Sequence, residues 1–175
     1  WGFGIGTQII VARRNGEKDF PAIGKTIDHG LYFLVPLAIL MFSLMKFLSD
    51  DFLFVMMDSE EVRQATSEYI NYRAYGLFFA FINFLFRAFY VGLGKTNVIT
   101  YSTTLLAIVN GILDYCLIFG NFGFPEMGIG GAALASVIAE ASALLFFIIY
   151  TRFAFSTQAY QLFHFQKFDP KLYFR

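Results

Sequence analysis

The sequence predicts an all-α protein, a polytopic bundle of transmembrane helices. Of the 175 residues, 57% are hydrophobic and only 15% are charged, whereas soluble domains are about 45–50% apolar and about 25% charged. The apolar residues also gather in runs close to the length of about 20 residues that a helix needs to cross a bilayer. Because a backbone in lipid must satisfy its own hydrogen bonds, each run is predicted to be a helix.

Five apolar segments follow one another, of which four are complete and the first has the composition of the end of a spanning helix. They cover residues 1–12, 26–48, 70–93, 98–119 and 129–150. Together they predict a transmembrane region over residues 1–152. Residues 153–175 are polar and aromatic, and we expect them to form a cytoplasmic linker, with an interfacial amphipathic helix as the alternative.

The charged connectors predict the orientation of these helices. Most of the 13 Lys and Arg residues lie in the connectors at 13–25 and 87–95 and in the segment 152–175, whereas the connector at 50–68 is mainly acidic. Basic residues gather in short cytoplasmic loops. The basic connectors are therefore predicted to face the cytoplasm and the acidic one to face outward.

Polar groups inside the predicted helices are the candidate functional residues, because such groups in a membrane usually mark pathways or coupling sites. Asn110 and Asp114 lie one helical turn apart in the fourth segment, and the same spacing recurs at Ser136 and Glu140 in the fifth. The two segments share a short connector, so Asp114 is expected to lie level with Ser136. Asn110 and Glu140 pair in the same way one turn deeper. Two such polar layers predict a hydrated pocket in the outer half of the bilayer.

Two of these polar groups also have a structural interpretation. Asn83, in the third segment, either lines a cavity or joins helices by a hydrogen bond worth about 0.6 kcal/mol. Glu140 either lines the cavity or ties helices together without taking part in transport. Small residues every four positions in the fifth segment predict a close helix-packing seam; they are Gly131, Ala135, Ala139 and Ala143.

Other site chemistries have no support in the sequence. There is no phosphate-binding loop, no His-Glu-x-x-His motif and only one cysteine, Cys116. No catalytic residue, bound metal or cofactor is therefore predicted, and the chain is not expected to be an enzyme. The few basic residues among the aromatic ones of the last segment form no stripe for nucleic acid.

Three stretches resemble one known family. VARRNGEKD at 11–19 is similar to the loop after the second helix of multidrug and toxic compound extrusion (MATE) transporters, and RAFYVGLGKT at 87–96 to the loop after their fourth helix. NGILD at 110–114 and PEMGIGGAALAS at 125–136 are similar to the fifth helix and to the outer loop with the sixth helix. The order and spacing of these motifs agree with the family over nearly the whole chain.

The resemblance implies a protein of twelve helices in two lobes, of which this chain covers the N-terminal lobe from late in helix two to just before helix seven. It implies a multi-pass protein of the prokaryotic inner membrane that extrudes cationic amphipathic drugs or toxins by alternating access. The driving force would be H⁺ or Na⁺, with no other cofactor, and the C-terminal lobe of the same protein would be the partner of this one.

The resemblance also implies roles for single residues. Asn110 and Asp114 match the pair that forms the N-lobe cation site of many prokaryotic members, and they are the candidate Na⁺ ligands. Ser136 matches its hydroxyl, whereas Tyr115 stands where a proline often follows the acid. The nearest alternative is a flippase for lipid-linked sugars, which would need basic residues that 98–150 lack; a membrane enzyme or scaffold subunit is the more distant one.

Overall fold

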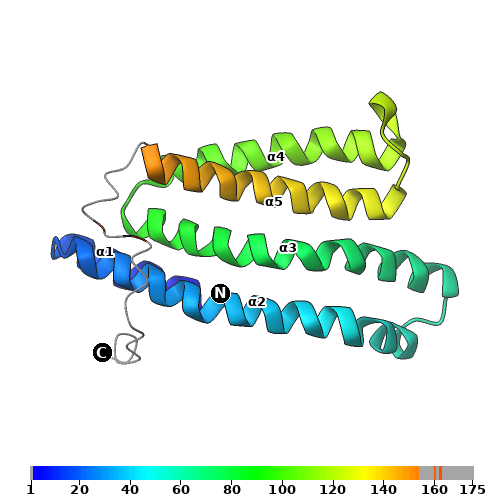
Figure 1. Cartoon of the computed structure of the whole chain (residues 1–175), viewed down its shortest axis with the longest axis horizontal. Coiled ribbons are helices and arrows are strands. Elements are labelled where there is room, and N and C mark those ends of the chain that lie inside the picture. Colours follow the sequence, from blue (N-terminus) through cyan, green and yellow to red (C-terminus); the bar gives the residue numbers. More distant parts are fainter. Residues whose placement is uncertain (1, 154–159, 161, 163–175) are drawn as a thin grey trace. The chain divides into compact units, whose positions relative to one another are not determined.

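The computed structural model describes residues 2–153, 160 and 162, and in this part of the chain every regular element is helical (Figure 1). The prediction of an all-α fold is confirmed. The linker predicted for 153–175 lies almost wholly outside the described residues. In chain order the elements are α1 (Gly2–Gly16), α2 (Phe20–Met56), α3 (Glu60–Gly92), α4 (Thr96–Phe119), the short 3-10 helix η1 (Asn121–Gly123) and α5 (Gly128–Phe153).

The helices continue past the apolar segments that predicted them. α2 has 37 residues and α3 has 33, which at about 1.5 Å per residue is far more than the roughly 30 Å of a hydrocarbon core. α2, α3, α4 and α5 are all long and apolar enough to cross a membrane. The chain is thus a multi-pass membrane protein, and the predicted partial segment corresponds to the 15 residues of α1.

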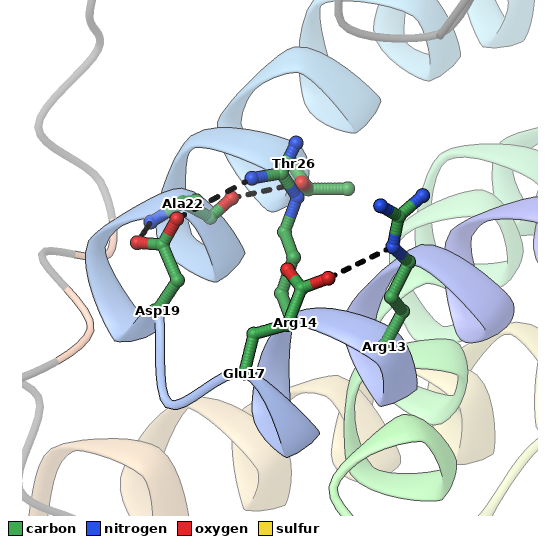
Figure 2. Close-up of polar contacts among 6 residues, drawn as sticks. All are labelled: Arg13, Arg14, Glu17, Asp19, Ala22 and Thr26. Carbon is green, nitrogen blue, oxygen red and sulfur yellow. Dashed lines mark hydrogen bonds and ion pairs between the residues drawn. The ribbon is translucent and has the colours of Figure 1, made fainter.

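The turn between α1 and α2 explains why α2 begins six residues before its apolar segment. The backbone N–H of Ala22 donates to Oδ1 of Asp19 over 3.3 Å, so the carboxylate caps the first turn of α2. Pro21 lies in this first turn, where the N–H that proline lacks has no acceptor within the helix. Figure 2 shows Asp19 between this cap and Arg14, whose Nη1 lies 3.6 Å from Oδ2.

Asp19→Ala is expected to lower the free energy of unfolding of the full-length protein by about 1–2 kcal/mol, because it removes the cap of α2. Asp19→Asn keeps a capping oxygen and loses only a half-exposed ion pair, so it should retain most of the stability. Thermal unfolding in detergent compares the two variants. Equal losses in both would mean that the charge of Asp19, rather than its cap, stabilises the turn.

The described chain divides into two compact units, each built from parts of several helices. The first unit contains residues 2–36, 81–102 and the described residues from Leu144 onward. Its core includes Phe86, Tyr90 and Phe147, with Phe86 stacked on Phe147 at 5.5 Å between ring centroids. The Thr151 hydroxyl donates to the Phe147 carbonyl over 2.6 Å and accepts from the Tyr90 hydroxyl at 2.7 Å, which joins α3 to α5.

The second unit contains residues 37–80 and 103–143. Here α2 packs on α3 through the ring of Phe42, 5.2 Å from that of Tyr75. Two hydrogen bonds continue the pairing: Lys46 Nζ donates to Asn71 Oδ1 over 2.7 Å, and the Ser67 hydroxyl donates to Asp50 Oδ1 over 2.7 Å. Cys116 is buried in this unit.

The small-residue seam predicted in the fifth segment is confirmed. All four of its residues, Gly131, Ala135, Ala139 and Ala143, are buried in α5. A Cβ atom at Gly131 would lie 2.6 Å from the carbonyl oxygen of Leu117, so α5 approaches the backbone of α4 at this level as closely as glycine allows. This contact fixes the register in which α4 and α5 run past each other.

Candidate ion-coupling site

The side chains of Asn110 and Asp114 form a hydrogen-bonded pair on one face of α4. Nδ2 of Asn110 donates to Oδ2 of Asp114 over 3.0 Å, and both side chains are half-buried. The spacing of four residues places them one turn apart, as predicted. With the amide nitrogen turned toward the carboxylate, the Asn110 carbonyl oxygen and Oδ1 of Asp114 accept no hydrogen bond from the described residues. Amide and carboxylate oxygens of this kind suit a proton or a hard cation such as Na⁺.

Ser136 lies near this pair in depth but does not join it. Since Gly131 packs on Leu117 and the two helices are antiparallel, Asp114 is level with Leu134. Ser136 is two residues further along α5, which is about 3 Å. Its side chain is half-buried and makes no hydrogen bond to Asn110 or Asp114 within the described chain. The hydroxyl is therefore available as a third ligand only if a bound ion bridges the helices.

Glu140 forms an ion pair with Arg73 of α3, a residue that the sequence analysis did not single out. Nη2 of Arg73 donates to Oε1 over 2.7 Å and Nη1 donates to Oε2 over 3.1 Å. The two parallel bonds are the strongest arrangement of a guanidinium on a carboxylate. The side chains are only 28% and 16% exposed, so both charges lie largely inside the second unit, where each needs the other.

Neighbouring residues of α3 support the guanidinium. Tyr69, one turn before Arg73, lies close enough for its hydroxyl to interact electrostatically with the guanidinium. Gly76 lies next to the ion pair: a Cβ atom there would meet the Arg73 guanidinium and would lie 2.9 Å from Oε2 of Glu140. The pair thus occupies space that only a glycine leaves open. One signal in the sequence could have indicated it, because Arg73 and Arg87 are the two basic residues of the apolar segment 70–93, and Arg87 lies near its end.

Gly76→Ala is expected to reduce the free energy of unfolding by about 2 kcal/mol, since the added methyl group must displace the ion pair or the helix backbone. Gly111→Ala in α4 is the matched control, because a Cβ atom there has nothing within 4 Å. It should be neutral or stabilising by up to about 1 kcal/mol. If thermal unfolding in detergent shows the same change in both variants, the ion pair is not confined by Gly76.

The last predicted site residue, Asn83, belongs to a different compact unit from the other four. It is buried, with 8% of its surface exposed, in the part of α3 that belongs to the first unit. Asn110, Asp114, Ser136 and Glu140 all belong to the second unit. The candidate residues of the fourth and fifth segments therefore lie in one unit of the structure, and Asn83 lies in the other.

Comparison with known proteins identifies the family. The MatE family model matches residues 1–116 of the chain. The chain belongs to the MatE family. The match includes Arg73, Asn110 and Asp114 and ends before α5, so the hydrogen-bonded pair and the guanidinium both lie on the family's matched sequence, whereas Ser136 and Glu140 lie beyond it. The family predicted from the loop motifs is confirmed.

Several bacterial relatives of this MatE chain are named as probable multidrug resistance proteins. It is 28% identical to NorM of Agrobacterium fabrum over 163 residues, which are 93% of this chain and 35% of that protein. It is 35% identical to NorM of Listeria monocytogenes over 130 residues, 74% of this chain and 28% of the relative. YoeA of Bacillus subtilis is 28% identical over 86% of this chain and 33% of its own length. The chain spans about a third of the length of these relatives.

A solved structure has the same fold as this MatE chain. It is described as an inward-facing conformation of a multidrug resistance MATE family transporter of the MOP superfamily. The match has a TM-score of 0.84 with 21% sequence identity, and it covers 98% of this chain and 38% of that one. The helical arrangement expected from the loop motifs is thus the arrangement of a known transporter fold.

Proposed function

We propose that the full-length protein is an antiporter that exports cationic amphipathic compounds by alternating access, driven by the inward flow of H⁺ or Na⁺. The observation that carries this proposal is the Asn110–Asp114 pair: a carboxylate in a membrane-crossing helix of a MatE chain, held by an amide at 3.0 Å. Relatives named as multidrug resistance proteins support the choice of cargo.

Asp114 is the exchangeable group in this proposal. A carboxylate in a membrane is costly unless it is protonated, paired or bound to a cation. The only hydrogen bond that it accepts within the described chain comes from neutral Asn110, so a proton or Na⁺ is the partner that would compensate its charge. Ser136, about 3 Å away in depth, would complete the oxygen ligands from α5.

The flippase alternative requires a cationic group for a pyrophosphate. α4 and α5 contain no Lys or Arg before Arg152, and the guanidinium that reaches α5 is Arg73. Both of its terminal nitrogens are already bonded to Glu140, so the ion pair is neutral overall and offers no uncompensated positive charge to an anion. This arrangement favours export of cations.

The proposal is tested by reconstituting the full-length protein in proteoliposomes loaded with ethidium, a fluorescent cation. Efflux is recorded under an imposed H⁺ gradient, an imposed Na⁺ gradient and no gradient. We expect one of the gradients to accelerate efflux and its collapse by an ionophore to stop it. Equal efflux with and without gradients would exclude coupling, and flipping of a lipid-linked pyrophosphate without any ethidium transport would favour the alternative.

A further inference from the structure

The Arg73–Glu140 ion pair is a pair of charges in the second unit that ion coupling at Asp114 does not use. Both residues lie near the middle of helices that can cross a membrane, α3 and α5. Charged groups at such positions usually serve a transport pathway. We propose that Glu140 is a second cation-binding carboxylate, which receives the positive group of the transported compound, and that Arg73 occupies it as a tethered counter-ion when no compound is bound. This inference rests on the proposed function, since it takes the cargo to be a cation.

The balance of charge at Glu140 favours a mechanism in which the cation of the cargo replaces the Arg73 guanidinium, over one in which the cargo binds beside it. Glu140 is the less exposed partner, at 16% against 28% for Arg73, and an uncompensated carboxylate in such a place is strongly unfavourable. If the cation of a cargo molecule replaces the guanidinium, the carboxylate stays neutralised throughout. Release of the cargo is then favoured by the return of Arg73, which cannot diffuse away.

The guanidinium has a place to move to. A helical side chain tilts toward the N-terminus of its helix, and in α3 this direction leads to Tyr69, which already interacts with the guanidinium. Glu68, the residue before Tyr69, is exposed, and its carboxylate lies beside Gly130 of α5. Arginine has a long flexible stem that lets its charged group reach toward water. Arg73 can therefore leave Glu140 without losing all of its polar neighbours.

Space at the carboxylate also supports a binding role. Gly76 adds no side chain of its own beside Oε2 of Glu140: the nearest groups to a Cβ at this position are the Arg73 guanidinium, Oε2 at 2.9 Å and Cγ2 of Val137 at 3.2 Å. If Arg73 withdraws, the position of its Nη1 beside Oε2 and Gly76 becomes open to another cationic group.

Asp114 and Glu140 are separate sites within the second unit. Asp114 is level with Leu134, and Glu140 is six residues further along α5, which is about 9 Å along the helix axis. Asp114 has its own hydrogen bond from Asn110 within α4, whereas Glu140 is bonded from α3. A coupling ion at Asp114 and a cargo cation at Glu140 would thus occupy different positions in the same unit.

The test measures the dissociation constant of ethidium for the purified full-length protein by fluorescence. Arg73→Gln removes the competing cation and should tighten ethidium binding about tenfold, the size of effect expected for a close charge pair. Glu140→Gln should weaken binding about tenfold, and the double variant should bind as weakly as Glu140→Gln alone. Lys46→Gln is the matched control, because it removes a positive charge that is bonded to Asn71 rather than to Glu140, and it should leave the constant unchanged.

If the ion pair is purely structural, Arg73→Gln should not tighten ethidium binding. Loss of Arg73 would then loosen the unit and leave ethidium binding weaker or unchanged. Either result for Arg73→Gln would overturn the proposal, as would an equal gain of affinity in Lys46→Gln. If Arg73→Gln does not fold, Arg73→Lys serves instead: it keeps the charge but loses the two-pronged contact, so it should bind ethidium more tightly than wild type, and equal or weaker binding refutes the inference. If the wild-type protein transports ethidium but none of these substitutions changes the dissociation constant, only this inference is refuted. If the wild-type protein shows no ion-coupled transport, the proposed function is refuted.

Discussion

Asp114→Asn in the full-length protein is expected to reduce ion-driven efflux of ethidium to the level of empty proteoliposomes. Asparagine has nearly the size of aspartate, and its carbonyl oxygen can still accept the hydrogen bond that Asn110 donates to Oδ2 over 3.0 Å. It can neither exchange a proton nor offer a charge to Na⁺. The substitution therefore removes the coupling chemistry and keeps the local structure. Folding and membrane insertion, followed by size-exclusion profile and expression level, should match those of wild type.

Two further substitutions at position 114 make the result decisive. If Asp114 carries the ion, Asp114→Leu should be as inactive as Asp114→Asn, and Asp114→Glu should keep part of the activity with a shifted pH optimum. If Asp114 serves only as a hydrogen-bond acceptor, Asp114→Asn should transport normally and only Asp114→Leu should be damaged. Wild-type efflux by the Asn variant at matched expression would end the assignment of Asp114 as the exchangeable group.

Breaking the Arg73–Glu140 ion pair from one side is expected to be the most destabilising single change in the second unit. Arg73→Met or Glu140→Leu leaves one charge uncompensated, at a cost of about 3 kcal/mol; this is the lower end of the range for buried pairs, because the guanidinium is 28% exposed. Replacing both residues together should bring the free energy of unfolding back to within about 1 kcal/mol of wild type. The measurement is a double-mutant cycle on unfolding in detergent.

Lys46→Met provides the reference for this cycle. Lys46 donates to the neutral side chain of Asn71 over 2.7 Å, so its loss leaves no buried charge behind, and a change of about 0.5 kcal/mol is expected. If the effects of Arg73→Met and Glu140→Leu simply add in the double variant, the two residues are not energetically coupled. The bidentate contact would then have no bearing on stability.

The helices of this protein could be predicted from their apolar runs, but their ends could not. The run at 26–48 predicts that a helix exists, whereas α2 begins at Phe20 because Asp19 caps it. Likewise, α3 begins ten residues before its apolar run, at Glu60, where the Ser59 hydroxyl accepts from the N–H of Val62 at 3.5 Å. A capping residue lets polar sequence continue a helix into water, and hydropathy alone does not register it.

In the candidate site, contacts within one helix could be predicted from the sequence, whereas contacts between helices could not. The bond between Asn110 and Asp114 follows from a spacing of four residues, which any α-helix converts into proximity. The contact of Arg73 with Glu140 joins residues 67 positions apart, and it exists because α3 and α5 run side by side with α4 between them in the sequence. The periodicity of one helix does not indicate which other helix it contacts. The sequence therefore could not decide whether Glu140 lines a cavity or ties helices together.

The sequence distance between Arg73 and Glu140 has a consequence for the biogenesis of the protein. A ribosome adding about 5–20 residues per second needs several seconds to pass from one partner to the other. During this interval Arg73 lacks its partner Glu140, and an arginine at the centre of a helix disfavours insertion from the translocon by about 2.5–3.5 kcal/mol. We therefore expect the insertion of α3 to be more stable once α5 has been synthesised. Nascent chains arrested before Glu140 should hold α3 in the bilayer less securely than chains that have released α5.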